Sequence, residues 1–440
     1  MNVLVINGSP KGKNSITYQT IRFLQKQFPQ DEFETLHVGA QIRLFEQDMT
    51  QAREAVRRAE LILFCYPVYT FIAPSQLHRF IELMKQEQLD VEGKYMVQIT
   101  TSKHFYDITA HRYVEDNCRD MGMRVFRGFS ADMEDLLKEQ GRRDVLKYWK
   151  YINYMIGREK SSGSEADRKL TVHNKDEKYR VVIVTDCAKD NEKLRRMIID
   201  FRKAFPYMSH VVNLRGFEFK GGCLGCFHCA VDGTCIYQDG FDSFLRERIQ
   251  RSDSIVYAFS IKDHSMGALF KTYDDRQFCN GHRTVTMGKP TAYLVDGDLD
   301  KEENLRMIIE ARSQVGGNYL AGVAVNENGG EHGSRDEIRV CADDLAYALE
   351  NQLMVNENFY GIGGMKIFRD LIFEMQGMMK ADHQFYKKHH FYDFPQKKIG
   401  KIMMMHAVGA LMRMPAGKNQ LQSKMTEGML MPYDKLLNDQ

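Results

Sequence analysis

The fold is decided by Val3-Leu4-Val5-Ile6-Asn7-Gly8-Ser9-Pro10, which stands at the start of the chain. Four consecutive apolar residues, three of them β-branched, are typical of a strand that is buried on both faces of a parallel sheet. A polar turn follows, and between Ser15 and Phe28 apolar residues recur with a helical period. This order of strand, turn and helix predicts the first half of a parallel β-α-β unit.

The same alternation continues along the N-terminal part of the chain. Further strands are expected at residues 33–37, 61–65, 95–100 and 124–129, with helical or polar segments between them. We therefore predict a five-stranded parallel sheet with helices on both faces, a three-layer α/β/α sandwich. An aromatic-rich helix over residues 145–156 contains the only tryptophan and is expected to pack against a neighbouring element.

The pattern then restarts after a charged segment rich in Ser and Gly. Residues 180–185 resemble the first strand, residues 254–259 the third and residues 289–295 the fourth. The second copy also carries a loop with four cysteines that the first copy lacks. We predict a first α/β domain over 1–158, a linker over 159–178, a second α/β domain over 179–351 and a mainly helical, Met-rich extension over 352–440.

Met-rich segments fill irregular apolar gaps, so the extension is expected to cover the domains or a subunit interface. A membrane-surface helix over residues 399–414 is the alternative.

Composition narrows the class of protein. The chain has 440 residues, with 61 Lys and Arg against 59 Asp and Glu, so net charge gives no reason to expect nucleic acid as a partner. No apolar run reaches the roughly 20 residues that span a bilayer, and a cytoplasmic protein is expected. The 9 cysteines are an odd count for a secreted disulfide framework.

Two loops indicate an anion-binding crevice in the first copy. Small and polar residues between Gly8 and Ser15 lie just before a helix, where backbone N–H groups and the helix dipole favour a phosphate. A strand-to-helix turn capped by Asn or Ser is the plain alternative. The second loop, residues 65–81, follows the third strand. In an open parallel sheet, ligands bind between the first and third strands at their carboxyl ends, so both loops are expected at one crevice.

The four-cysteine loop has the spacing C-x2-C-x2-C-x5-C, formed by Cys223, Cys226, Cys229 and Cys235. Short spacing with interspersed glycines lets four thiolates converge, and a tight run of three cysteines with a later fourth favours a 4Fe-4S cluster. Tetrahedral zinc and metal-free thiols are the alternatives. The other five cysteines are interpreted as small buried residues.

These motifs resemble the flavodoxin-like FMN reductase and iron-sulfur flavoprotein family of NAD(P)H-dependent oxidoreductases. The resemblance rests on residues 7–11 with 14–17, on residues 66–69 with 74–77, and on the cysteine loop. It implies two tandem flavodoxin-like domains, FMN as cofactor, NAD(P)H as co-substrate and a 4Fe-4S cluster on the four cysteines. It assigns the FMN phosphate to Ser9, Lys11, Asn14, Ser15 and Thr17, the isoalloxazine ring to Pro67, Val68, Tyr69 and Thr70, and the edge of the ring to Thr101 and Ser102.

The two copies depart from this pattern in opposite ways. The second copy has Asp186 and Asp190 in its first loop, where they would repel a phosphate, and it lacks the Pro-Val-Tyr of the flavin loop. We expect that it has lost FMN binding. Since one subunit borders the flavin of the other in single-copy relatives, we hypothesise an internal heterodimer with the cluster of the second copy near the FMN of the first.

The sequence thus predicts an NAD(P)H-dependent, FMN-containing oxidoreductase that passes electrons, with a 4Fe-4S cluster, to a small-molecule acceptor or a redox protein. A homo-oligomer is compatible with the resemblance. A non-catalytic electron-transfer flavoprotein and a degenerate scaffold that binds a protein partner are the alternatives. No catalytic residue is named, because hydride transfer to a flavin needs positioning rather than a dedicated acid.

Overall fold

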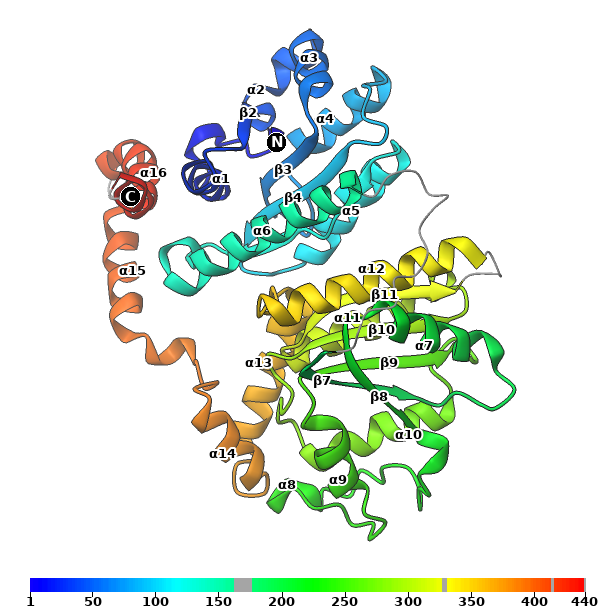
Figure 1. The fold of residues 1–440 in the computed structure, drawn as a ribbon. Coiled ribbons are helices and arrows are strands. Elements are labelled where there is room, and N and C mark those ends of the chain that lie inside the picture. The colour runs from blue at the N-terminus through cyan, green and yellow to red at the C-terminus, as the bar shows by residue number, and fades with distance from the viewer. Residues whose placement is uncertain (162–175, 327–330, 413–414, 439–440) are drawn as a thin grey trace. The chain divides into compact units, whose positions relative to one another are not determined.

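The computed structural model describes residues 1–161, 176–326, 331–412 and 415–438 (Figure 1). They belong to two compact units. The first unit comprises residues 1–163, 356–359 and 394–440, and the second comprises residues 164–355 and 360–393. Most of the predicted linker, residues 162–175, lies outside the described residues.

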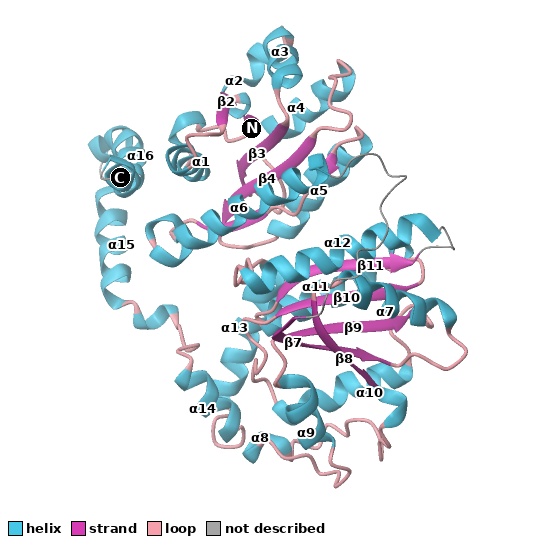
Figure 2. Ribbon diagram, viewed as in Figure 1, coloured by secondary structure: helices cyan, strands magenta, loops and turns pink. Residues whose placement is uncertain are grey.

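Strands and helices alternate in the first unit (Figure 2). Its strands are β1 (Asn2–Asn7), β2 (Glu32–Leu36), β3 (Leu61–Pro67), β4 (Tyr95–Ser102), β5 (Arg124–Val125) and β6 (Phe129–Asp132). Its helices are α1 (Ile16–Gln27), α2 (Val38–Phe45), α3 (Thr50–Arg58), α4 (Ser75–Gln86), α5 (Asp107–Asp120), α6 (Glu139–Ser161), α15 (Ile399–Met412) and α16 (Pro415–Asn438).

All strand pairs of the first unit are parallel, in the order β2-β1-β3-β4, with both β5 and β6 beside β4. The single fifth strand expected at 124–129 is therefore split in two. The chain passes very close to its neighbours at the break, because a Cβ on Gly128 would lie 2.5 Å from Cγ of Gln98. The rest of the predicted α/β sandwich is confirmed.

Alternate residues of each strand point to opposite faces of this sheet. Leu4 and Ile6 pack with residues of α2 to α5, whereas Val3 and Val5 pack with residues of α1 and α6. Trp149 of α6 is fully buried in the second of these cores, as expected for the aromatic-rich helix. Both faces of the sheet are therefore occupied by packing, which leaves the strand ends for ligands.

The second unit repeats this topology. Its strands are β7 (Asp176–Thr185), β8 (Tyr207–Asn213), β9 (Ser254–Ser260), β10 (Pro290–Asp296) and β11 (Tyr319–Asn326). They form a five-stranded parallel sheet in the order β8-β7-β9-β10-β11, which matches the first unit strand for strand. Its helices are α7 (Glu192–Ala204), α8 (Cys229–Asp232), α9 (Phe241–Phe244), α10 (Ala268–Arg276), α11 (Glu303–Gly316), α12 (Glu331–Glu350), α13 (Phe359–Glu374) and α14 (Lys380–Lys388).

The helices of the C-terminal region are divided between the units. Helices α13 and α14 belong almost entirely to the second unit, and α15 and α16 to the first. Tyr433 and Leu437 of α16 are buried in the core beside α1. The Tyr433 hydroxyl donates to the carbonyl of Met133, and Asp434 lies 3.2 Å from Arg22. Helix α16 is thus an integral part of the first unit.

Residues 356–359 are also attached to the first unit. Asn356 accepts a hydrogen bond from the backbone N–H of Ser130 at 2.7 Å and donates one to the carbonyl of Ser130 at 2.6 Å. The backbone N–H of Phe359 donates to the buried carboxylate of Asp107 at 2.9 Å.

No helix in the described part of the chain is both long and apolar enough to cross a membrane.

Trp149 is expected to be a major contributor to the stability of the first unit. Its indole N–H donates to Oδ2 of Asp31 at 2.9 Å, and its ring packs against Phe28 and Phe33. Trp149→Ala should lower the free energy of unfolding by about 3–5 kcal/mol, because it leaves a cavity and removes the indole hydrogen bond to Asp31. Urea unfolding followed by circular dichroism measures this, since the variant has no tryptophan fluorescence. Tyr154→Ala, on an exposed part of α6, should cost less than about 1 kcal/mol; equal losses would contradict the prediction.

Candidate functional site

The first candidate site begins at the loop after β1. Asn7, the buried last residue of β1, donates from Nδ2 to the carbonyl of Gly12 at 2.9 Å and accepts from the backbone N–H of Ser9 at 3.1 Å. Its side chain therefore holds the loop in a closed turn. Helix α2 packs directly against this turn. No side chain fits at Gly39, because a Cβ there would lie 2.3 Å from the carbonyl oxygen of Gly8.

Helix α1 starts directly behind this loop. Ser15 is its N-cap residue, and its side chain makes no capping hydrogen bond. The first N–H groups of a helix have no intrahelical partner, and the helix dipole makes that end partly positive. An uncapped N-terminus next to a tight polar loop therefore suits a phosphate group.

The loop after β3 contains a tight turn. The backbones of Tyr69 and Ile72 exchange hydrogen bonds of 2.8 and 3.1 Å, and the two residues between them, Thr70 and Phe71, both have positive φ, at 46° and 73°. Positive φ is unfavourable for these side chains, particularly for β-branched threonine.

The second unit builds an equivalent turn. Lys262 and Ser265 exchange backbone hydrogen bonds of 2.8 and 2.9 Å, with positive φ at Asp263 and His264. Because both units contain this turn, it belongs to the repeated fold, and the difference between the units lies in the side chains that the turn carries.

The loops after β1, β3 and β4 enclose a cavity of about 310 Å³. Ten of the eleven residues predicted for FMN line it, namely Ser9, Lys11, Ser15, Thr17, Pro67, Val68, Tyr69, Thr70, Thr101 and Ser102. Asn14 is not among the lining residues. The sequence did not predict the remaining ones, which are Ile16, Phe71, Lys103, Phe105, Met133 and Met429. Ile16, Phe71 and Lys103 adjoin predicted positions, and Phe105 lies three residues after Ser102. Met429 comes from α16, and no local motif indicates it.

Two hydroxyl groups in this cavity are without a partner. Oγ1 of Thr17 and Oγ1 of Thr101 are buried and make no hydrogen bond in the described part of the chain. A buried hydroxyl without a partner is costly, and a ligand with phosphate or carbonyl oxygens would satisfy it. The cavity volume lies at the lower end of the range for small-molecule sites. The residues present therefore fit FMN. The hydroxyl groups and the uncapped helix end suit its phosphate, and Pro67, Tyr69 and Phe105 provide apolar surfaces for its ring.

The corresponding edge of the second unit has different chemistry. Asp186 follows β7 where Gly8 follows β1, and it is buried. Burial raises the pKa of Asp186, although Lys262 lies 3.8 Å away. A carboxyl group in this position leaves less room than glycine and repels a phosphate when ionised.

The four predicted cysteine ligands line a second cavity, of about 300 Å³. Cys223 and Cys226 are exposed, and Cys229 and Cys235 are half-buried. Burial raises the pKa of Cys229, and its neighbours Cys223, Cys235 and Cys226 raise it further. Among the described residues no group of three or more His, Cys, Asp or Glu side chains is arranged to hold a metal ion. The thiols thus share one cavity without a formed coordination site.

A buried arginine holds the cysteine loop. Arg276, at the end of α10, forms two hydrogen bonds of 2.8 and 2.9 Å to Asp239 and donates to the carbonyl of Gly221 at 2.8 Å. Although burial opposes ionisation, hydrogen bonds from Arg276 lower the pKa of Asp239 to about 2. Nε of Arg276 is buried without a partner, and Cys235 is among the groups that raise the arginine's pKa. The cavity therefore has a buried arginine–aspartate ion pair beside a thiol.

No local sequence pattern indicates Arg276, because it lies in a different element from the cysteine loop. Nor does any pattern indicate that Cys279 is more than a small buried residue. Cys279 is buried, as expected, but it lines the same cavity as the four loop cysteines. Burial raises the pKa of Cys279 to about 12.

The fold is that of a flavodoxin-like α/β protein, and the first cavity lies at the carboxyl edge of its sheet. Residues 1–133 match the family model described as NADPH-dependent FMN reductase. The match spans the strands of the first unit, β1 to β6, and indicates an oxidoreductase enzyme. A comparison with curated proteins finds no match.

Solved structures with likeness to the chain include three reductases. An NAD(P)H:quinone oxidoreductase from Methanothermobacter marburgensis is 16% identical, with 39% of this chain and 96% of that chain covered and a TM-score of 0.31. An FMN-dependent NADH-azoreductase from Bacillus anthracis, in complex with FMN, is 12% identical, with coverage of 34% and 99% and a TM-score of 0.28. An NADPH-quinone reductase from P. pentosaceus is 15% identical, with coverage of 33% and 94% and a TM-score of 0.28.

Thr17 offers a direct test of the first cavity. Thr17→Val keeps the shape of the side chain but removes the unpartnered hydroxyl, so it should weaken FMN binding about tenfold without lowering the stability of the FMN-free protein. Fluorescence titration of FMN and a thermal melt measure the two quantities. Thr20→Val is the matched control, because Thr20 is buried on the same helix but does not line the cavity. Unchanged FMN affinity in Thr17→Val would exclude a contact with this hydroxyl.

Proposed function

We propose that the protein is an NAD(P)H-dependent oxidoreductase that binds FMN in the first unit and delivers electrons to a small-molecule acceptor or a redox protein. The cavity at the ends of β1, β3 and β4 carries this proposal, because it brings together predicted FMN residues from three separate loops. The match of residues 1–133 to the FMN reductase family supports it.

The residues of the cavity divide into two groups by chemistry. Ser9, Ser15 and Thr17, with the N-terminal N–H groups of α1, would hold the phosphate of FMN. Pro67, Val68 and Tyr69 would lie against the isoalloxazine ring. Bound FMN supplies hydride chemistry, in which it accepts a hydride from a nicotinamide and returns electrons to an acceptor.

Methionine side chains from distant parts of the chain would complete the apolar part of this site. Met133 and Met429 line the cavity, and the hydrogen bond from Tyr433 to Met133 ties α16 to the loop after β6. We propose that α16 shields the bound cofactor from water. This gives part of the Met-rich extension a role within the first unit.

We further propose that Cys223, Cys226, Cys229 and Cys235 hold a 4Fe-4S cluster. Four thiols with compact spacing line one apolar cavity, and Nε of the buried Arg276, which has no hydrogen-bond partner in the described residues, would donate to a thiolate or to the cluster. A cluster of this type transfers single electrons. Zinc or free thiols would instead give a colourless site.

Absorption spectra and NAD(P)H oxidation test the main proposal. Purified protein incubated with FMN and passed over a desalting column should retain a single FMN per chain and should oxidise NADH or NADPH when an artificial acceptor is added. A protein that retains FMN but does not oxidise either nucleotide would be an electron-transfer flavoprotein. A protein that retains no FMN would contradict the proposal.

The cysteines are tested separately. The double substitution of Cys226→Ser with Cys229→Ser should abolish iron binding after anaerobic reconstitution with iron and sulfide, and should leave FMN binding unchanged, because none of the four cysteines lines the FMN cavity. Iron analysis and the broad visible absorbance of the cluster measure the first effect. Cys187→Ser is the control, since Cys187 lies outside the cysteine cavity. Full iron content in the double variant would disprove the cluster assignment.

A further inference from the structure

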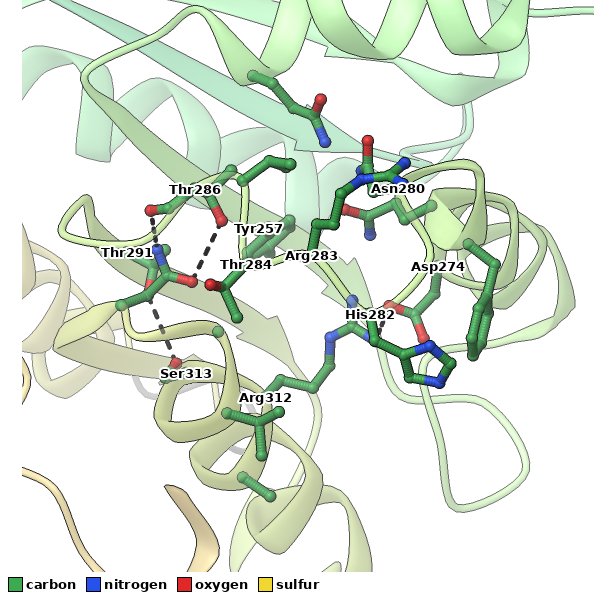
Figure 3. Close-up of a pocket in the computed structure, with 18 of the residues that line it drawn as sticks. Tyr257, Asp274, Asn280, His282, Arg283, Thr284, Thr286, Thr291, Arg312 and Ser313 are labelled. Atoms are coloured by element: carbon green, nitrogen blue, oxygen red, sulfur yellow. Dashed lines mark hydrogen bonds and ion pairs between the residues drawn. The ribbon is translucent and has the colours of Figure 1, made fainter. Parts of the chain in front are cut away.

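A larger cavity, of about 410 Å³, lies next to the cysteine cavity in the second unit (Figure 3). Phe278, Gly281 and His282 line both cavities, so a single layer of residues separates them. Thr291, near the start of β10, and Asn318, just before β11, place the new cavity toward the amino ends of the strands. It is therefore distinct from the edge that corresponds to the FMN site.

Much of the lining of this cavity is aromatic and apolar. The rings of Tyr257 and Tyr293 line it, with their centroids 5.0 Å apart. Phe278, Val285 and Ile308 also line it, and they are unusually exposed for apolar residues, at 49%, 40% and 38%. Exposed apolar side chains around an aromatic-lined cavity are typical of a site for a flat organic ring.

The cavity also contains a guanidinium group that is paired on one side and open to a ligand on the other. Arg312 extends from α11 toward His282 and Asp274 in Figure 3, and its Nη1 lies 2.6 Å from the Asp274 carboxylate. The arginine side chain is 41% exposed, whereas that of Asp274 is 10% exposed. A guanidinium has five N–H donors in a planar fork, so one carboxylate does not use all of them.

Other polar groups also line the cavity. Arg283 is one of them and lies 3.2 Å from the carboxylate of Asp382. Asp274 is the only acidic residue among the lining residues in the described part of the chain. Hydroxyl groups of Thr284, Thr291 and Ser313 provide further hydrogen-bonding positions. A ligand with one acidic group would therefore find both charge and hydrogen bonds here.

We propose that this cavity binds the electron acceptor, as a flat aromatic molecule with one anionic group, such as a quinone that carries a sulfonate or carboxylate. The acceptor role rests on the oxidoreductase function proposed above. Arg312 binds the anionic group, and the aromatic residues bind the ring. The overall reaction is NAD(P)H + H⁺ + quinone → NAD(P)⁺ + hydroquinone, in which the two quinone oxygens gain two electrons and two protons.

Binding is tested on the full-length protein with anthraquinone-2-sulfonate and its uncharged analogue anthraquinone-2-sulfonamide, by titration calorimetry. Arg312→Gln should weaken binding of the sulfonate about tenfold or more and change binding of the sulfonamide by less than about twofold. Arg306→Gln is the matched control, because Arg306 is on the same helix, pairs with Asp300 and does not line the cavity. Asp274→Asn is a second variant, which tests the site if Arg312→Gln fails to fold. It keeps the arginine and should bind the sulfonate at least as tightly as the unmodified protein.

Turnover provides the second readout. Arg312→Gln should raise the KM for anthraquinone-2-sulfonate about tenfold, while the rate at which NADPH bleaches the flavin absorbance stays unchanged, because Arg312 does not line the FMN cavity. Two outcomes would overturn the site. One is equal binding of the sulfonate by Arg312→Gln and the unmodified protein. The other is a folded Arg312→Gln variant that loses binding of the sulfonate and the sulfonamide in parallel. Arg312-dependent binding in a protein whose flavin NADPH cannot reduce would overturn the acceptor role and the proposed function together.

Discussion

Parallel strand pairing is the constraint on which the rest of the structure depends. In each unit the strand side chains are packed on both faces, and only the strand ends remain for chemistry. The first strand lies between the second and third, with Asn7 opposite Cys65 and Pro67 opposite Thr101. The loops after β1, β3 and β4 therefore meet, although long stretches of sequence separate them. Residues as far apart as Ser9 and Thr101 line one cavity for this reason.

The same topology carries two different sets of side chains at its strand ends. Both units have the same strand order and the same tight turn after the central strand. The difference is in single residues at the strand ends, such as glycine at position 8 against a buried aspartate at position 186. Because the packing of the sheet does not depend on these loops, their side chains can change while the fold is retained. A fold of this kind indicates where a ligand binds, but only the site residues indicate which ligand.

The second unit has two cavities away from the edge that corresponds to the first unit's site. The cysteine loop has little regular structure of its own, and the buried pair of Arg276 and Asp239 attaches it to α10. The short turn that follows α10 supplies Phe278 and His282, which separate the cysteines from the aromatic cavity. One helix end thus supports both cavities, and a change in this turn would affect both.

The sequence alone determined the fold class and most of the candidate site. Buried strands are recognisable from continuous apolar runs such as Val3 to Ile6, and the polar loops that follow them are local in sequence. It also identified the four cysteines, because their spacing is short. The split of the expected fifth strand near Gly128 was not predictable, because it depends on how closely the chain approaches Gln98.

Only the tertiary structure decided which distant residues join these sites. Met429 lines the cavity at the ends of β1, β3 and β4 because Tyr433 and Leu437 of α16 are buried beside α1. Arg276 lines the cysteine cavity because α10 ends next to the cysteine loop. Such positions follow from the packing of helices against a sheet rather than from any local pattern. Local sequence therefore specifies strands, turns and compact ligand motifs, whereas contacts between elements far apart in the chain depend on the folded core.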